Sequence, residues 1–246
     1  MLSLRAAADR GHANHGWLDS HHTFSFADYY DPEQLGYRAL RVINDDRVAP
    51  GQGFGSHPHR DMEILSYVLE GQLEHRDSLG NGAVIGPGQW QHISAGAGVT
   101  HSEFNPSPTE PVHFYQIWIK PRAKGLTPRY AELDSNLLAD ARRNLGGGFA
   151  LVASPDGAEG SLPLEQDAHV WLARLEPSQT AEASLGRGRG AWLQVLRGDI
   201  RIEAGEGADH EELTATEGDG VTAEEVAKLR ITALSAGAEV MLFDLP

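Results

Sequence analysis

Two short segments place metal-ligating side chains two residues apart. The first contains His57 and His59, and the second contains His101 and Glu103. On an extended strand such residues point to the same face, about 7 Å apart. Two such strands facing one another across a barrel could therefore bring all four side chains to one ion, at the roughly 2.0–2.2 Å typical of these ligands. Three imidazoles and a carboxylate suit iron, manganese, cobalt, nickel, copper or zinc, and they do not suit calcium.

The spacing alone leaves alternatives open. The chain has 12 histidines, so a single pair of this kind could be incidental. Glu63 is a rival carboxylate, because it keeps the parity of His59 if the strand continues; it could be a ligand, an acceptor for an imidazole N–H, or a surface charge. His92 is interpreted as a neighbour of the ligands or of a pocket, whereas the apolar neighbours of His75 predict that it points outward.

Strand-like runs surround these segments, and turns separate them. A strong turn signal is the Asn81-Gly82 pair. Short strands at this regular spacing predict a β-sandwich or barrel. The clearest runs are residues 38–43, 64–69, 73–76 and 113–119, followed after a gap by residues 170–173, 192–196, 200–202 and 240–243.

The second set of runs echoes the first. Residues 195–200 resemble residues 68–73, which indicates two copies of one β unit. Superposing the copies puts Ser184 and Gly186 where the first histidine pair lies, and neither side chain can bind a transition metal. Between the copies, a short helix is expected from Asp134 to Asn144, because a glycine run follows it.

Composition narrows the class of protein. The formal net charge is −15, which disfavours direct binding to nucleic acid. The chain has no cysteine, which excludes disulfides and thiolate chemistry. No stretch approaches the length of a membrane span, and the first residues lack the apolar core of a signal peptide. We therefore expect a soluble cytoplasmic protein without membrane contact.

Longer motifs surround the ligand pairs. Residues 51–60, with Glu63 and Gly71, resemble the first cupin motif, and residues 87–103 resemble the second motif in its pirin form. Residues 22–32 and 239–246 are also similar to pirins. The resemblance to the pirin family covers essentially the whole chain and is closest to bacterial pirins described as quercetinases.

This resemblance implies an all-β bicupin fold, with two tandem cupin β-barrels or sandwiches and few short helices. Residues 1–120 would form a metal-binding cupin with additional N-terminal strands, residues 121–149 a connector, and residues 150–246 a cupin without metal ligands. Pirins hold one metal with three histidines and a glutamate. The matching positions are His57, His59, His101 and Glu103. General cupins take the carboxylate from the first motif, so Glu63 is the alternative.

The resemblance also implies a quercetin 2,3-dioxygenase-like oxidoreductase that cleaves a flavonol with O2 and releases carbon monoxide. One divalent transition metal ion would serve as cofactor, with iron as the first candidate, and Glu103 would be the catalytic base. A monomer is expected. Two alternatives stay open: a redox-responsive regulator that binds a protein partner without turnover, and a cupin enzyme acting on another phenol. Candidate pocket residues are Phe54, Trp90, His92, Phe114 and Trp118.

Overall fold

The computed structural model describes residues 1–133, 148–205, 207 and 210–246. The chain forms two compact units. The N-terminal unit comprises residues 11–135 and 164–166, and the C-terminal unit comprises residues 1–10, 136–163 and 167–246. Among the described residues, strands dominate, and the only helices are two three-residue 3-10 turns, η1 (Ala7–Asp9) and η2 (Ala158–Gly160). The expected all-β fold is therefore confirmed.

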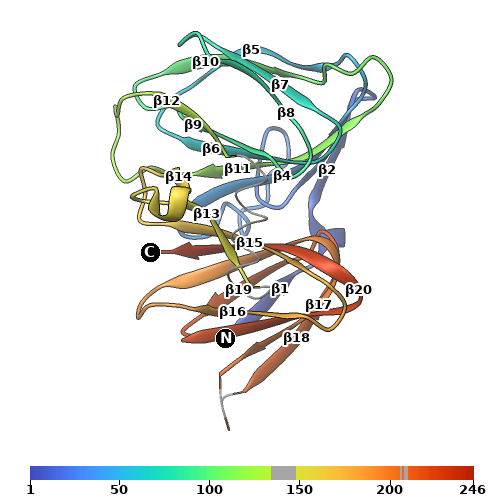
Figure 1. Cartoon of the computed structure of the whole chain (residues 1–246), viewed down its shortest axis with the longest axis vertical. Helices are drawn as coiled ribbons and strands as arrows, with labels where there is room; N and C mark the ends of the chain where they lie inside the picture. The colour runs from blue at the N-terminus through green and yellow to red at the C-terminus, as the bar shows by residue number, and fades with distance from the viewer. Residues whose placement is uncertain (134–147, 206, 208–209) are drawn as a thin grey trace. The chain divides into compact units, whose positions relative to one another are not determined.

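The N-terminal unit consists of two antiparallel sheets (Figure 1). The four-stranded sheet has the order β5-β10-β7-β8, and the seven-stranded sheet has the order β12-β9-β6-β11-β4-β3-β2. The strands are β2 (Gly11–Asn14), β3 (Leu18–His22), β4 (Leu40–Val48), β5 (Gly53–His59), β6 (Glu63–Glu70), β7 (Leu73–Asp77), β8 (Gly82–Ile85), β9 (Trp90–Ser94), β10 (Val99–Phe104), β11 (Val112–Ile119) and β12 (Arg129–Leu133).

Alternating side chains from the two sheets fill the space between them. Leu73 and Ile85 of the small sheet pack with Val68, Val112 and Phe114 of the large sheet in one buried apolar cluster. Burial of such side chains contributes on the order of 1.5–3 kcal/mol each. This cluster holds the two sheets together.

The C-terminal unit contains one sheet of nine strands. Its two longest strands, β17 and β20, pair along most of their length, with register shifts near Arg197 and between Gly198 and Ile200. Such bulges bend a strand and let one sheet fold around a core. Its strands are β1 (Leu2–Arg5), β13 (Ala150–Ser154), β14 (Leu162–Pro163), β15 (His169–Leu175), β16 (Thr180–Ser184), β17 (Gly190–Ala204), β18 (Glu211–Ala215), β19 (Gly220–Glu224) and β20 (Lys228–Leu245).

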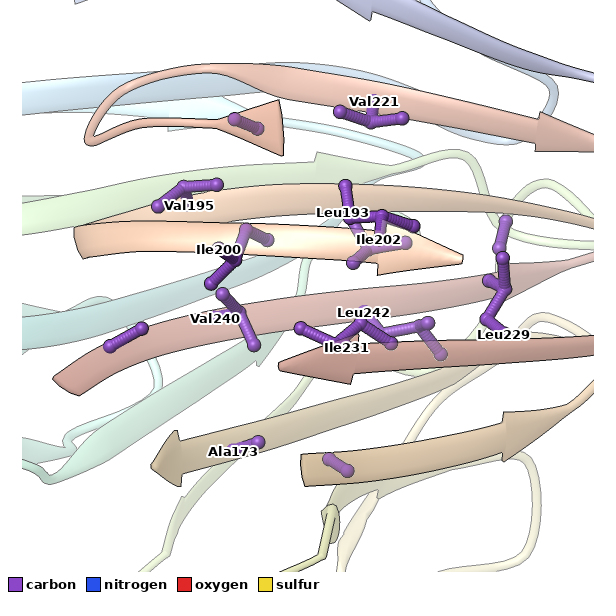
Figure 2. Packing of buried hydrophobic residues seen from close by; sticks show 14 of the residues in the cluster. Ala173, Leu193, Val195, Ile200, Ile202, Val221, Leu229, Ile231, Val240 and Leu242 are labelled. Carbon is purple, nitrogen blue, oxygen red and sulfur yellow. The ribbon is translucent and has the colours of Figure 1, made fainter. Parts of the chain in front are cut away.

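Aliphatic side chains fill the core of the C-terminal unit. Leu193 and Ile202 from β17 lie among Val221 of β19 and Val240 and Leu242 of β20 (Figure 2). All five are essentially inaccessible to solvent. This packing is that of a structural β unit.

The unit boundaries differ from those expected in two places. Strand β1 pairs with β19, so the first ten residues belong to the C-terminal unit and not to the N-terminal one. Strand β12, in the expected connector, pairs with β9 as the edge of the large sheet. The helix expected from Asp134 to Asn144 lies outside the described residues. Within the described parts of the chain, no helix is both long enough and apolar enough to cross a membrane.

Candidate metal centre

The register of three strands gathers the predicted ligands. In the small sheet, His101 of β10 lies opposite His57 of β5, and Glu103 of β10 lies opposite His75 of β7. Directly opposed residues on antiparallel strands share a face. His59 joins that face because it follows His57 by two residues on the same strand. The two ligand segments are therefore neighbouring strands of one sheet, and not strands that face one another across a barrel as expected.

Three imidazoles form a tight cluster. The ligand atoms of His57, His59 and His101 all lie within 4.8 Å of one another. The Nε2 atoms of His57 and His101 are 3.1 Å apart. The Nδ1 of His57 lies 2.8 Å from the Gly55 carbonyl, which can only accept, so the ring donates from Nδ1 and keeps a lone pair on Nε2.

The protonation of the cluster favours metal binding. Burial, together with repulsion from the neighbouring His101 and His57, lowers the pKa of His59 to about 4. Burial, followed by repulsion from His57 and His75, lowers the pKa of His101 to about 3. Both rings are therefore neutral at physiological pH, which is the form that binds metals.

The spacing of the cluster fits a transition metal ion. Two nitrogens that lie about 2.1 Å from one ion are roughly 3 Å apart when their bonds are near a right angle, and the Nε2 atoms of His57 and His101 have this separation. Two lone pairs so close repel one another unless a proton or cation lies between them. The donor set therefore suits one divalent ion of the transition series.

Glu103 lies beside His101, and the opposite sheet fixes its position. The side chain is buried and accepts hydrogen bonds of 3.2 Å from Ser66 and 2.7 Å from Gln116, and another from Gln91. These three donors lie on β6, β11 and β9, at positions that oppose one another across the sheet. A polar residue in an apolar strand, as in Ser66 among Ile64, Leu65 and Tyr67, is the sequence signal that could have found them.

Glu63 lies elsewhere, which corrects its proposed role as a fallback ligand. It is three residues from Ser66 on β6, so the two side chains point to opposite faces. Its carboxylate accepts hydrogen bonds from His92 at 2.9 Å and Ser94 at 2.6 Å. Burial alone would raise the pKa of Glu63, but these bonds and the attraction of His92 outweigh it and hold the pKa below its usual value.

A cavity of about 740 Å³ lies within the N-terminal unit and reaches the cluster. Its wall includes His57, His59 and Glu103, together with the predicted pocket residues Phe54 and Trp118. This volume is within the usual range for small-molecule sites. Trp118 contacts the ring of His59 edge to face, with centroids 5.0 Å apart. An aromatic wall therefore adjoins the imidazoles.

Three predicted pocket residues do not line this cavity. Trp90 is fully buried and stacks on Tyr67 with ring centroids 4.4 Å apart. His92 is buried against Glu63, on the face of β9 opposite to Gln91. Phe114 lies in the apolar cluster between the sheets. All three side chains are buried, but strand parity and core packing direct them away from the cavity.

Several cavity residues were missed. Trp17 and Phe26 add aromatic surface, and Trp17 packs edge to face on Phe54 with centroids 5.4 Å apart. Asp46 adds a buried carboxyl group, which accepts a hydrogen bond from Ser20. Burial raises the pKa of Asp46 to about 7, opposed by the Ser20 hydrogen bond and supported by repulsion from nearby carboxylates. The sequence signal that could have found Asp46 is the acidic pair that it forms with Asp45 within a strand.

His75 was expected to point outward, and it does not. The side chain is fully buried and stacks on Tyr130, with centroids 4.6 Å apart and planes within 10°. On β7 it alternates with Glu74 and Arg76, so it shares the inner face with Leu73. The apolar neighbours of His75 led to the wrong prediction that it points outward. An inner face is usually apolar, but here the site makes it polar, so a histidine can point inward.

Comparisons with known proteins agree along the whole chain. Residues 3–119 match the sequence profile of the pirin family, and residues 151–245 match that of the quercetinase C-terminal cupin domain. A protein of Escherichia coli K12 named quercetin 2,3-dioxygenase is 47% identical over 246 residues, which cover 100% of this chain and 99% of the relative. A putative quercetin 2,3-dioxygenase of Pasteurella multocida is 40% identical over 249 residues, covering 100% of both.

Solved structures give the same result. A crystal structure of the bacterial pirin YhhW from Escherichia coli, in complex with nickel(II), has a TM-score of 0.89 and 47% identity, covering 100% of this chain and 99% of that one. A quercetin 2,3-dioxygenase from Acinetobacter baumannii, at 20% identity and a TM-score of 0.68, covers 93% of this chain and 81% of that one, and shares the fold.

Proposed function

The chain belongs to the pirin family, and on that premise we propose that it is a metal-dependent dioxygenase that cleaves flavonols such as quercetin with O2. The observation that carries the proposal is the three-histidine cluster in the wall of a cavity of about 740 Å³ with aromatic sides. A relative with 47% identity that is named quercetin 2,3-dioxygenase supports this reaction class. In this reaction the flavonol and O2 would become a ring-opened ester and carbon monoxide.

The proposed metal ligands are His57, His59, His101 and Glu103. The nickel complex of a relative supports a divalent transition ion, and we propose iron and nickel as the first ions to test. When bound, such an ion supplies Lewis acidity, which lowers the pKa of a coordinated hydroxyl group. The protein prepares this site by keeping the imidazoles neutral and by holding the carboxylate with three donors from the opposite sheet.

The cavity walls would orient a flat, hydroxylated ring system. Phe54 and Trp118, with Trp17 and Phe26 beside them, offer faces and edges against which an aromatic substrate packs. Trp118 also contacts His59, so a ring lying on this wall would end beside the ligand cluster. The same apolar surface would exclude water from the reacting carbons.

Two carboxyl groups are available for the proton of the substrate hydroxyl. We propose Glu103 as the ligand that also borders the reacting hydroxyl, because three hydrogen bonds fix it at the cluster. Asp46 lines the same cavity and has a pKa of about 7, so at neutral pH it can take up or return a proton. The two groups together allow one carboxylate to stay in place while the other exchanges the proton.

The test is oxygen consumption and carbon monoxide release with quercetin, on protein reconstituted separately with Fe(II), Mn(II), Co(II), Ni(II) and Cu(II). Turnover and one bound ion per chain are expected for the wild type and for His169→Ala, a partly exposed histidine of the C-terminal unit that lies outside the potential metal-ligand groups of the described residues. Both should be lost in His57→Ala. If one ion binds but no metal supports turnover, the proposed dioxygenase activity is overturned, and a regulator without turnover or an enzyme for another phenolic substrate is favoured.

A further inference from the structure

A chain of polar contacts runs behind the histidine cluster. The Nε2 of His75 lies 3.2 Å from the Oδ2 of Asp77, and its Nδ1 lies 3.4 Å from the Nδ1 of His101. The other nitrogen of His101, Nε2, faces the Nε2 of His57 at 3.1 Å. Each ring nitrogen of His75 and His101 therefore has one specific neighbour, and the contacts link Asp77 to the cluster.

The direction of these hydrogen bonds follows from Asp77. Its Oδ1 accepts hydrogen bonds from the backbone N–H groups of Leu79 and Asn81, and its Oδ2 accepts one from the side-chain amide of Asn81, so the group is surrounded by donors as a carboxylate requires. An ionised carboxylate only accepts, so His75 carries its proton on Nε2. A neutral His75 then presents a lone pair at Nδ1. A charged His75 would be repelled by a cation bound to the adjacent histidine, so the neutral form is the one compatible with the centre.

The orientation of His101 follows in turn. Facing an acceptor at Nδ1 of His75, the Nδ1 of His101 must donate. A neutral imidazole has a single N–H, so the Nε2 of His101 is left with its lone pair. That atom is the one that faces the Nε2 of His57.

His75 itself is not available as a ligand. Both of its nitrogens are engaged, one by Asp77 and one by His101, and its ring stacks on Tyr130. Although the ligand atoms of His75, His101 and Glu103 also lie within 4.8 Å of one another, this geometry places His75 behind His101.

We propose that Asp77 and His75 are positioning residues that fix the tautomer of His101, so that His101 offers its Nε2 lone pair to the metal. This inference rests on the metal centre proposed above. Partners that orient a ligating histidine in this way contribute roughly 10–100-fold to metal affinity.

Two substitutions of His75 separate hydrogen bonding from packing. His75→Phe keeps an aromatic ring against Tyr130 and fills the buried space, but it removes the acceptor for His101. His75→Asn loses the stacking and leaves a space, but its side-chain oxygen can take the place of Nδ1 as the acceptor. A purely structural role predicts that Phe is the better replacement, whereas the positioning role predicts that Asn is.

The first readout is the Kd for Ni(II), measured by competition with a chelator. We expect His75→Phe to weaken binding by about 10–100-fold and His75→Asn to stay much closer to the wild type. The second readout is the tautomer of His101 in the metal-free protein, from long-range ¹H–¹⁵N spectra of labelled histidine rings. The wild type and His75→Asn should show a protonated Nδ1 on His101, and His75→Phe should lose this preference.

The outcomes separate the two proposals. Ni(II) binding by His75→Phe equal to that of the wild type, or a His101 protonated on Nε2 in the wild type, would overturn the positioning role. A wild type that binds no Ni(II) or other divalent transition ion would instead remove the metal centre, while the tautomer spectra would still test the orientation of His101.

Discussion

The buried carboxyl group of Asp46 gives a prediction about the pH dependence of stability. The side chain is 2% exposed, and burial raises its pKa from about 3.8 to about 7. The folded protein therefore binds a proton that the unfolded chain releases between these values. Because the native state holds more protons in this range, its stability must fall as the pH rises. Replacing Asp46 by Asn keeps the shape and removes this dependence.

The magnitude follows from the size of the shift. One pKa unit corresponds to about 1.4 kcal/mol, so a shift of roughly three units amounts to about 4 kcal/mol over the full range. Part of this stability is already lost below pH 5.5, and about 2 kcal/mol of the loss falls between pH 5.5 and 8.5. We therefore expect Asp46→Asn to gain about 2 kcal/mol relative to the wild type across that interval.

Urea denaturation of metal-free protein at a series of pH values measures this difference. Comparing two variants at each pH cancels the titration of all other groups. Only the transition of the N-terminal unit should shift, because Asp46 lies there. Glu110→Gln, which changes an exposed carboxylate of the same unit, should run parallel to the wild type. Parallel curves for Asp46→Asn as well would refute the raised pKa, and a slope of opposite sign would show that Asp46 is stabilised as an anion.

Three further predictions concern other residues of the N-terminal unit. Glu63→Gln should lower the free energy of unfolding by about 3 kcal/mol or more, because it breaks the buried hydrogen-bonded pair with His92. One metal per chain should remain bound. In the wild type the stability that this pair contributes is lost as the pH falls through the depressed pKa of Glu63. Trp118→Leu should raise KM for quercetin by about tenfold at unchanged metal content in steady-state assays, because a stacking wall is lost. Gly53→Ala should lower the free energy of unfolding in urea by about 1–3 kcal/mol and weaken Ni(II) binding, because the new Cβ would lie 2.3 Å from the Glu103 carbonyl oxygen. As a control, Gly55→Ala should leave stability and Ni(II) binding unchanged, because its Cβ would meet nothing within 4 Å.

The all-β fold and the histidine cluster were predictable because each depends on a local regularity. Short strands with turns between them indicate the fold, and a spacing of two residues on one strand puts His57 beside His59 without further information. The choice of Glu103 over Glu63 needed the family resemblance. The structure supplies the physical reason: the carboxylate of Glu103 faces three donors on the opposite sheet, and no sequence pattern encodes which strands will face one another.

The alternative of Glu63 as a ligand depended on the strand of His59 continuing. Strand β5 ends at His59 and β6 begins at Glu63, and between them Asp61 has a φ of +51°. A residue in this left-handed conformation reverses the chain direction, so the parity of His59 does not extend to Glu63. The same limit explains His92, which takes its direction from β9 and from its pairing with Glu63.

Phe54 shows the converse case, in which broken parity brings a residue into the site. It is three residues before His57, so an unbroken strand would point it away from the histidines. The register of β5 against β10 shifts between His101 and Glu103, so that Phe54 lies opposite Glu103 and His57 lies opposite His101. One strand therefore advances three residues while the other advances two, as in a β-bulge. The extra residue restores Phe54 to the inner face, so this irregularity brings an aromatic side chain to the cavity wall.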